Sequence, residues 1–249
     1  MKTKQFLLIL AAASSLVFSC KKDDENKTPI QNPNPNPSNS CSLSSSMEND
    51  TGYTAFFYNT NGSLARFVEK NPSADTSKIE LIYDGKTVTL SSNGVAAGTY
   101  YLNNKGYADS IIVDFQGFIR MGTYNTYDAN GYLVSQNQSF EFLGINSTIV
   151  RTYTYSGGNL SKMTEESDGE TTVTTYEYFT DKDNKFANNN LDALFMGKPN
   201  VNLIKTETVN GVLSTSYAYE FDSKSNPTKQ TATDANAGKS IVVYNWSCK

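Results

Sequence analysis

The chain has 249 residues with 21 basic and 25 acidic side chains and no histidine, so its net charge is −4. The lack of histidine excludes Ser-His-Asp and Cys-His catalysis and any histidine-ligated metal. The slightly acidic balance, without a basic patch, argues against nucleic acid as a partner. We expect no metal and no cofactor.

The first 19 residues have the pattern of a secretory leader. Lys2 and Lys4 form a basic start, and the apolar run over residues 6–18 is too short to span a bilayer. Ser19 then precedes Cys20, an arrangement that resembles a bacterial lipobox. The resemblance implies cleavage before Cys20 and acylation of Cys20, for instance with palmitate. Several acyl chains together anchor a protein stably. An ordinary secretory leader with an incidental cysteine is the alternative.

The residues after Cys20 suggest a location. The run Lys21-Lys22-Asp23-Asp24-Glu25 resembles the acidic export signal of surface lipoproteins in the Bacteroidota. The resemblance implies an outer membrane lipoprotein that faces the cell surface, with the periplasmic face as the alternative. A charged run is also typical of a simple solvated spacer.

Residues 20–46 are predicted to form the lipidated cysteine and a disordered tether. Pro33, Pro35 and Pro37 alternate with asparagine, and serines follow around Cys41. Such a composition cannot bury a core and favours extended, solvated backbone. We therefore expect this segment to hold a folded domain away from the membrane.

Residues 47–249 are predicted to form a single β domain. Segments 54–58, 78–83, 111–115 and 171–178 alternate in period two and are rich in strand formers. Turn signals separate such segments: Asn61-Gly62, Asp84-Gly85, Asn93-Gly94, Asn130-Gly131, Gly157-Gly158, Asp168-Gly169 and Asn210-Gly211. The pattern predicts an all-β fold, a single antiparallel meander of roughly 10–14 strands forming a twisted open roll or half-barrel. A closed barrel or a two-sheet sandwich is the alternative.

A degenerate repeat runs through this domain. Two alternate aromatic residues precede turn residues, a glycine or asparagine and an apolar residue in segments 57–66, 124–133, 153–162 and 217–227. These segments resemble the tyrosine-aspartate repeats of Rhs-type proteins. They are even more similar to uncharacterised Bacteroidota surface lipoproteins with degenerate hairpins of this kind. We expect Tyr124, Tyr153, Tyr176 and Tyr217 on strands before turns, where core packing is the commoner role of such rings.

Two cysteines remain beside Cys20. Cys41 and Cys248 lie at the two ends of the folded region, and outside the cytoplasm such a pair forms disulfides. Chain ends often lie close together in compact domains, which favours pairing. Two free thiols are the alternative.

The segment over residues 181–199 interrupts the hairpin pattern. An insertion of this length is either a functional loop or a plug that closes one end of the sheet, and Leu194, Phe195 and Met196 favour the plug. Asp181 and Asp183 do not continue as a calcium loop, because later positions lack the required ligands. We expect no metal here.

The sequence predicts a non-catalytic surface lipoprotein with a binding or envelope-structural role and an unknown ligand. A glycan-capture protein of a polysaccharide-uptake system is one alternative. A carbohydrate-active hydrolase is another, because Asp114, Glu141, Glu177 and Glu220 sit in strand-like segments where two carboxylates could pair across strands. Glu165 and Glu166 are adjacent and would face opposite sides of a strand.

Overall fold

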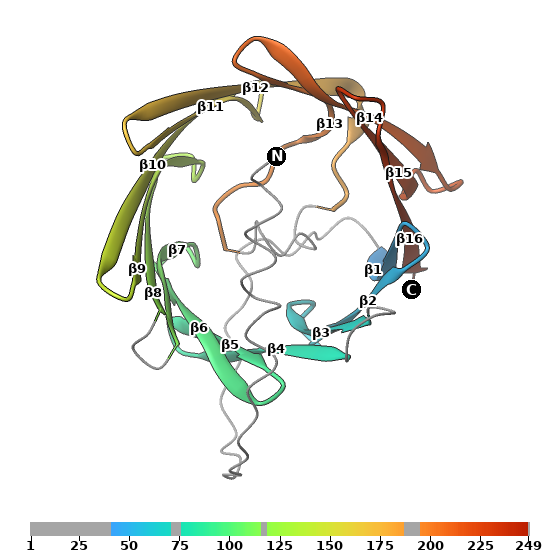
Figure 1. The fold of residues 1–249 in the computed structure, drawn as a ribbon. Coiled ribbons are helices and arrows are strands. Elements are labelled where there is room, and N and C mark those ends of the chain that lie inside the picture. The colour runs from blue at the N-terminus through green and yellow to red at the C-terminus, as the bar shows by residue number, and fades with distance from the viewer. Residues whose placement is uncertain (1–40, 71–75, 116–118, 187–194, 249) are drawn as a thin grey trace.

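A computed structural model describes residues 41–70, 76–115, 119–186 and 195–248. Within these ranges the chain forms sixteen antiparallel strands, each paired with its sequence neighbours, and the first strand pairs with the last. The sheet is therefore a closed barrel, seen along its axis in Figure 1, with blue β1 beside dark-red β16. The same ranges include no helix that is long and apolar enough to cross a membrane.

The strands vary in length from 6 to 14 residues. In chain order they are β1 (Cys41–Glu48), β2 (Gly52–Tyr58), β3 (Leu64–Lys70), β4 (Ser77–Asp84), β5 (Thr87–Ser92), β6 (Val95–Leu102), β7 (Ala108–Phe115), β8 (Ile119–Tyr127), β9 (Leu133–Phe142), β10 (Ile145–Ser156), β11 (Asn159–Ser167), β12 (Glu170–Asp183), β13 (Asn202–Val209), β14 (Val212–Phe221), β15 (Pro227–Asp234) and β16 (Lys239–Cys248).

The predicted all-β antiparallel meander is confirmed, but the open roll of 10–14 strands is wrong. Strands such as β9 and β15 consist largely of Ser, Thr, Asn, Gln and Lys, so the sequence gives them a weak strand signal. They form because both neighbours supply hydrogen-bonding partners for their backbone. Closure removes the two sheet edges that an open roll would leave unpaired.

The predicted start of the β domain at residue 47 lies inside β1, which begins at Cys41. Serine-rich sequence favours a tether by composition. In the barrel, however, Leu43 is 2% exposed, and β1 pairs with β16 on one side and β2 on the other. Tertiary pairing overrides the weak local preference of residues 41–46.

The seven predicted turn signals all fall at connections between consecutive strands. At Asn93-Gly94 and Asn210-Gly211 both residues have positive φ, between 49° and 86°, the geometry of a two-residue hairpin turn. Glycine and asparagine adopt that geometry at low cost, which explains why the turns could be recognised from sequence.

The longer hairpin loops share an internal hydrogen-bond pattern. In the loop after β8, the backbone N–H of Asp128 donates to the carbonyl of Tyr132, and the N–H of Tyr132 donates to the Asp128 carboxylate, both at 2.9 Å. Asp222 makes the same two contacts with Asn226 in the loop after β14. The side chain at the first loop position thus stabilises the reversal.

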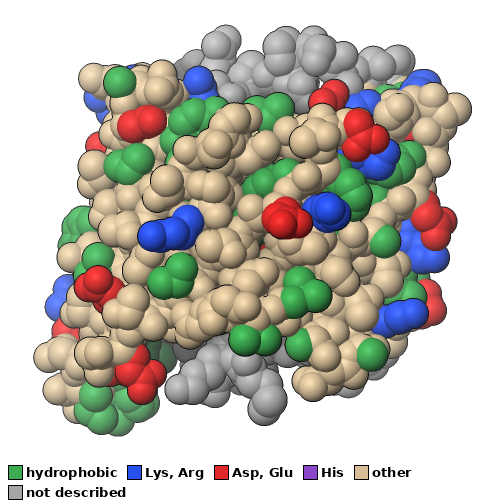
Figure 2. All heavy atoms as spheres, turned by 90° about the horizontal axis from the view of Figure 1, so that it is seen from above, with side chains coloured by type: hydrophobic (Ala, Val, Ile, Leu, Met, Phe, Trp, Pro, Cys, Tyr) green, Lys and Arg blue, Asp and Glu red, His purple; other side chains and the backbone are tan. Residues whose placement is uncertain are grey.

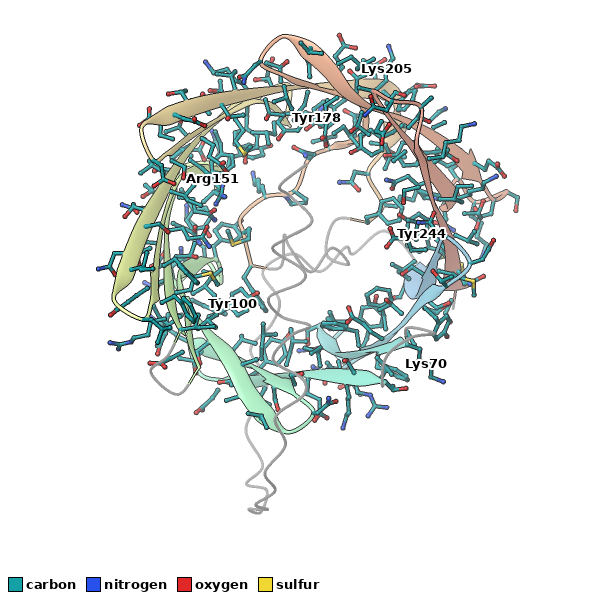
Figure 3. All side chains as sticks on the ribbon, in the orientation of Figure 1. Lys70, Tyr100, Arg151, Tyr178, Lys205 and Tyr244 are labelled. Carbon is teal, nitrogen blue, oxygen red and sulfur yellow. A yellow bond between two sulfur atoms is a disulfide. The ribbon has the colours of Figure 1, made fainter. Side chains whose placement is uncertain are left out.

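The two faces of the wall are identified by alternation. Figure 3 shows Tyr100, Arg151, Tyr178 and Tyr244 pointing into the barrel and Lys70 and Lys205 pointing away from it. Residues two apart on a strand, and residues paired in register on neighbouring strands, share a face. From these labelled positions, we assign each remaining residue of the strands to the inner or the outer face of the barrel.

The apolar core occupies one side of the interior, over β3 to β7. Its members are all less than 9% exposed: Leu64, Phe67, Ile79, Leu81, Tyr83, Val88, Leu102, Ala108 and Phe195. Phe195 comes from the connection between β12 and β13, and its ring lies 6.2 Å from that of Tyr83 and 5.4 Å from that of Tyr100. Phe195 therefore completes this core although it lies far along the chain from Tyr83 and Tyr100.

The described ends of the β12–β13 connection pack on opposite sides of the interior. Phe186 stacks against Tyr244 and Trp246 on β16, with ring centroids at 4.7 and 5.8 Å. The carbonyl of Phe195 accepts hydrogen bonds from the Ala108 N–H at 2.7 Å and the Tyr127 hydroxyl at 3.3 Å. Figure 1 shows the orange chain before β13 running inside the ring of strands. This packing agrees with the predicted plug, although Leu194 lies outside the described residues.

Cys41 and Cys248 are joined by a disulfide across the seam between β1 and β16. They are also register partners on these two strands. The covalent bond therefore links the first and the last strand at the point where the barrel closes. We call this end of the barrel, which also carries the β12–β13 connection, the disulfide end.

Candidate functional site

A wall of inward-facing tyrosines lines the barrel from β10 to β16. Three even-numbered strands each carry two tyrosines two positions apart, and β16 carries a tyrosine followed by tryptophan. We call this set the tyrosine wall: Tyr153, Tyr155, Tyr176, Tyr178, Tyr217, Tyr219 and Tyr244. Tyr178 and Tyr244 point into the barrel in Figure 3, and alternation and register place the others with them.

The tyrosine wall is more open than the apolar core on the other side. On β10, β11, β14 and β16 every residue is half-buried or exposed, whereas β4 and β5 contain several buried residues. A closed barrel of about sixteen strands is wide enough that side chains alone do not fill it. The tyrosine wall is thus the part of the inner surface that remains available for contact.

A polar network centres on Arg151, which points inward from β10 (Figure 3). Its Nε donates to the Glu165 carboxylate at 2.7 Å, and its Nη1 donates to the side-chain oxygens of Gln136 at 2.9 Å and Gln138 at 3.2 Å. The arginine side chain is 18% exposed and the glutamate 31%. A partly buried pair of this kind is held by its extra hydrogen bonds as well as by charge attraction.

The strand register explains how this network is assembled. Gln136 on β9 and Glu165 on β11 are the direct cross-strand partners of Arg151. Gln136 also donates to the Asn125 side-chain oxygen on β8 at 3.2 Å. Four consecutive strands therefore contribute one polar side chain each at the same level of the barrel.

A second carboxylate lies farther round the wall. Glu207 on β13 is the register partner of Tyr176 and accepts a hydrogen bond from the Tyr217 hydroxyl at 3.0 Å. Burial raises the pKa of the Glu207 carboxyl, and the bond from Tyr217 lowers it in part. The site therefore combines two carboxylates in different environments, one paired with arginine and one with a tyrosine hydroxyl.

Burial also acts on the tyrosines themselves. It raises the pKa of the Tyr153 hydroxyl to about 12, and it raises the pKa values of Tyr176 and Tyr217 as well. Removing a phenol from water disfavours the phenolate. These hydroxyls consequently stay protonated at neutral pH and remain available as both donors and acceptors.

The far edge of the tyrosine wall is formed by β15 and β16. The Tyr244 hydroxyl donates to the Gln230 side-chain oxygen at 3.0 Å, and the Trp246 indole N–H donates to the Pro227 carbonyl at 2.6 Å. Trp246 is the only tryptophan of the chain. It lies beside Tyr244 at the edge of the tyrosine wall and packs on Phe186, so its fluorescence reports on this surface.

The carboxylates proposed from sequence for hydrolysis do not gather inside the barrel. Asp114, Glu177 and Glu220 form ion pairs on the outer face with Arg120, Lys205 and Lys229, and Glu141 alternates with the inward Gln136 and Gln138. Glu166 also faces outward. Only Glu165 of the predicted carboxylates joins the inner network.

Glu165 and Glu207, the two carboxylates of this site, are well separated along the wall. Glu165 pairs with Thr172 and Glu207 pairs with Tyr176, so their levels differ by four residues of β12. This corresponds to roughly 13 Å along the strand and about 10 Å across two strand spacings. Glycosidases hold their two carboxyl groups about 5–10 Å apart.

Sequence reasoning missed Arg151, Gln136 and Glu207. The signal for Arg151 was present, because it lies in phase with Tyr153 and Tyr155 in an alternating strand and hence on the aromatic face. Glu207 gave no such signal, since an irregularity at Lys205 changes the alternation on β13.

The remaining predicted positions fall elsewhere. Cys20 lies outside the described residues. Asp181 is exposed, and its carboxylate forms an ion pair with Lys182 at 3.1 Å. Across the described ranges no group of three or more Cys, Asp or Glu side chains is placed to hold a metal ion.

The outer wall of the barrel is largely polar, with single exposed apolar or aromatic residues within strands: Met47, Phe57, Ile82, Tyr101, Tyr124 and Val243. The outward face of β9 presents Ser135, Asn137, Ser139 and Glu141, and that of β15 presents Lys229, Thr231 and Thr233. Figure 2, which views the barrel from above Figure 1, shows an outer surface made mostly of backbone and uncharged side chains, with scattered charges and separate apolar spots. Some of the most exposed large apolar residues, Leu143, Ile145 and Val212, lie at or beside hairpin turns.

The polarity of the wall is thus reversed relative to a membrane-spanning barrel. Transmembrane strands place apolar residues outward, in a band about 25 Å tall, and polar residues inward. Here the outward positions carry ion pairs on β4, β7–β8, β12–β13 and β14–β15. The inward positions carry leucines, phenylalanines and tyrosines, together with the polar network around Arg151 and the Glu207–Tyr217 pair.

The sequence matches no family model and no curated protein. Among solved structures, the barrel is similar to a porin-like protein from Bacteroides uniformis ATCC 8492, with a TM-score of 0.64 and 17% identity, covering 82% of this chain and 98% of that one. It is also similar to a porin-like protein from Bacteroides vulgatus ATCC 8482, with a TM-score of 0.59 and 11% identity, covering 82% and 97%. At these identities the likeness shows the fold: the chain has the closed barrel of these porin-like proteins.

Proposed function

We propose that this protein is a lipid-anchored protein of the bacterial envelope whose barrel stands in water beside the outer membrane. In this proposal it has a non-catalytic role in binding or in envelope structure. The observation that carries the proposal is the polar, charged outer wall around an aromatic interior.

The energetic argument concerns the outward charges. A lysine or arginine on the lipid face of a barrel costs about 2–4 kcal/mol at the bilayer midplane. Lys205, near the middle of β13, and Lys229, near the start of β15, face outward, each beside a glutamate. The outward face of β9 adds four consecutive polar positions. Insertion of this wall into lipid would therefore be opposed by charged or polar outward residues on β4, β7–β9 and β12–β15.

The anchor rests on the lipobox-like sequence at Cys20. Between Cys20 and the first residue of β1 the chain has 21 residue steps, which reach roughly 70 Å when fully extended. A tether of this length allows the barrel to stand clear of the headgroups. The acidic run after Cys20 supports display on the cell surface, with the periplasmic face as the alternative.

The spacing of the inner carboxylates supports a non-catalytic role. Glu165 is engaged by Arg151, and Glu207 lies on the other side of β12 at a different level. A hydrolase of the kind considered from sequence needs a close pair in one cleft. Binding requires no such pair.

Glycan capture is the second candidate, and the tyrosine wall favours it. Ligand sites combine aromatic surface with a few well-placed polar groups. Here Arg151, Gln136 and Glu207 supply such groups among the tyrosines.

The barrel's relation to the membrane is tested with the chain of residues 20–249 carrying Cys20→Ser, which has no lipid. We expect this protein to remain monodisperse without detergent in sedimentation velocity. We also expect it to add no conductance to planar bilayers in which a pore-forming barrel, as positive control, opens channels. A requirement for detergent together with channel formation would overturn the proposal.

A further inference from the structure

We propose that the tyrosine wall between β10 and β14 is a binding site for a neutral oligosaccharide, with Arg151, Glu165, Tyr176 and Glu207 as its central contacts. This inference rests on the proposed function, because it requires a barrel surrounded by water. It specifies the ligand's chemical class and the side of the barrel that receives it.

The position of the site follows from burial. On the opposite side, the apolar core is packed around Phe195, and Leu64 and Val88 are 2% and 0% exposed. Among the described residues, the centre of that side is therefore filled by packed side chains. The half-buried residues of β10, β11 and β14 keep part of their inner surface accessible.

The chemistry of the wall matches a sugar. The faces of pyranose rings carry C–H groups that pack on aromatic rings, whose faces are electron-rich. Sugar hydroxyls both donate and accept, so they need partners of both kinds. The wall supplies donors from Arg151 and the tyrosine hydroxyls and acceptors from Glu165 and Glu207.

The charges of the wall argue against a strongly charged ligand. Arg151 is neutralised by Glu165 at 2.7 Å, so it offers no free positive charge to an anionic ligand. A cationic ligand would find the Glu207 carboxylate, which already accepts a hydrogen bond from Tyr217, but it would also have to approach the guanidinium group of Arg151. A neutral polyhydroxylated ligand meets neither penalty.

Tyr176 lies between the two polar groups of the wall. It is the register partner of Glu207, and it is four residues along β12 from Thr172, the register partner of Glu165. The electrostatic surroundings of Tyr176 include both carboxylates. We therefore expect an oligosaccharide with one ring stacked on Tyr176 to reach Glu165 and Arg151 with its rings on one side and Glu207 and Tyr217 with its rings on the other.

The binding experiment uses the chain of residues 20–249 with Cys20→Ser and a panel of neutral oligosaccharides such as maltoheptaose, cellohexaose, xylohexaose and mannohexaose. Oligogalacturonate and chitosan hexamers serve as anionic and cationic comparators. Titration is followed by Trp246 fluorescence and by calorimetry. We expect at least one neutral oligosaccharide to bind and to change Trp246 emission, and the charged comparators to bind at least about tenfold more weakly.

Matched variants test the site. We expect Arg151→Gln and Tyr176→Leu each to weaken binding about tenfold or more, because each removes a central contact. The controls are Arg120→Gln and Tyr124→Leu, which change an outward arginine and a tyrosine that is 56% exposed on the outer face. We expect both controls to bind within about twofold of the parent protein.

A footprint on the unmutated wall keeps the test independent of variant folding. Hydroxyl radicals oxidise accessible tyrosine rings whether or not the hydroxyl is ionised, and peptide mass spectrometry reports the extent at each one. We expect the bound oligosaccharide to lower oxidation of Tyr153, Tyr176 and Tyr217 and to leave Tyr124 unchanged.

Three results would overturn the inference: no neutral oligosaccharide binding across the panel, binding by a charged comparator alone, or binding that neither protects the wall tyrosines nor responds to Arg151→Gln. None of these results bears on the polar outer wall. The sedimentation and conductance measurements described above decide that question separately.

Discussion

At the scale of single residues, buried tyrosine hydroxyls connect successive hairpins. Tyr58 donates to the Leu43 carbonyl at 2.9 Å, Tyr83 to Leu64 at 2.8 Å and Tyr127 to Ala108 at 2.7 Å. In each case a tyrosine near the end of an even-numbered strand donates to a backbone carbonyl near the start of the preceding strand. The ring therefore serves in packing, while its hydroxyl satisfies a backbone carbonyl inside the barrel.

Replacement of Tyr83 by Phe tests this role. The side chain is 8% exposed, so the change leaves the Leu64 carbonyl without this donor, and we expect a loss of about 1 kcal/mol in the free energy of unfolding. Urea denaturation followed by circular dichroism measures it. Tyr124→Phe, on the outer face, is the control and should leave the midpoint unchanged. Equal effects in both variants would contradict the assigned role.

Ionisation of Glu207 makes the free energy of unfolding depend on pH. Burial raises the pKa of this carboxyl in the folded protein. The stability that the protonated carboxyl contributes is therefore fully present below the unfolded pKa and is lost as pH rises through the folded pKa. We expect Glu207→Gln to match the parent protein at about pH 4 and to be the more stable of the two at pH 7. Urea midpoints at the two pH values provide the measurement.

The matched control for Glu207 is Glu220→Gln. Glu220 faces outward and pairs with Lys229 at 2.7 Å, so its loss should be neutral or slightly destabilising at pH 7. If Glu207→Gln were less stable than the parent protein at pH 7, the burial effect would not dominate at this site.

At the scale of elements, the barrel depends on one long-range pairing. Every other strand pair joins sequence neighbours, whereas β1 and β16 pair across the whole domain. The Cys41–Cys248 disulfide, at a sequence separation of 207, lies at the end of this seam. A crosslink over so long a loop restricts the unfolded chain strongly in the entropic description.

We expect the double variant Cys41→Ser/Cys248→Ser to lose about 2–5 kcal/mol of unfolding free energy. The backbone ladder from Leu43 to Glu48 should still close the barrel, so the strand content by circular dichroism should not change. Reductant should destabilise the parent protein and leave the variant unaffected. Non-reducing mass spectrometry should recover a Cys41–Cys248 peptide; two alkylatable thiols would refute the pairing.

At the scale of the whole molecule, the wall's polarity and the N-terminal anchor belong together. A barrel with outward ion pairs and inward aromatic residues needs another means of staying at a membrane, and an acylated Cys20 would supply it. The closed sheet also leaves no edge strand for pairing with other chains. These features suit a protein displayed on a surface.

Cys20→Ala should therefore move the protein from the membrane fraction to the soluble fraction. In cells with the parent protein, added protease should degrade the barrel from outside if it faces the cell surface. A periplasmic reporter protein is the control for outer membrane integrity. Retention of the Cys20→Ala protein in the membrane would contradict the anchor.

The sequence by itself determined the class of fold and the positions of many turns. Period-two alternation and pairs such as Asn93-Gly94 and Asn210-Gly211 act within a few residues, so they can be recognised without knowing the rest of the fold. Alternation also indicated that Tyr153, Tyr176 and Tyr217 lie on strands. By strand register all three face the interior, whereas Tyr124 faces outward and is exposed.

Only the tertiary structure decided the number of strands, the closure and the candidate site. Weak strands such as β9 form because both neighbours pair with them, and closure depends on contact between residues about 200 positions apart. Alternation defines two faces of a strand but does not say which one lies on the concave side. That choice places Arg151 and Glu207 inside the barrel and the paired lysines outside, because the curvature of the closed sheet fixes which face becomes the interior.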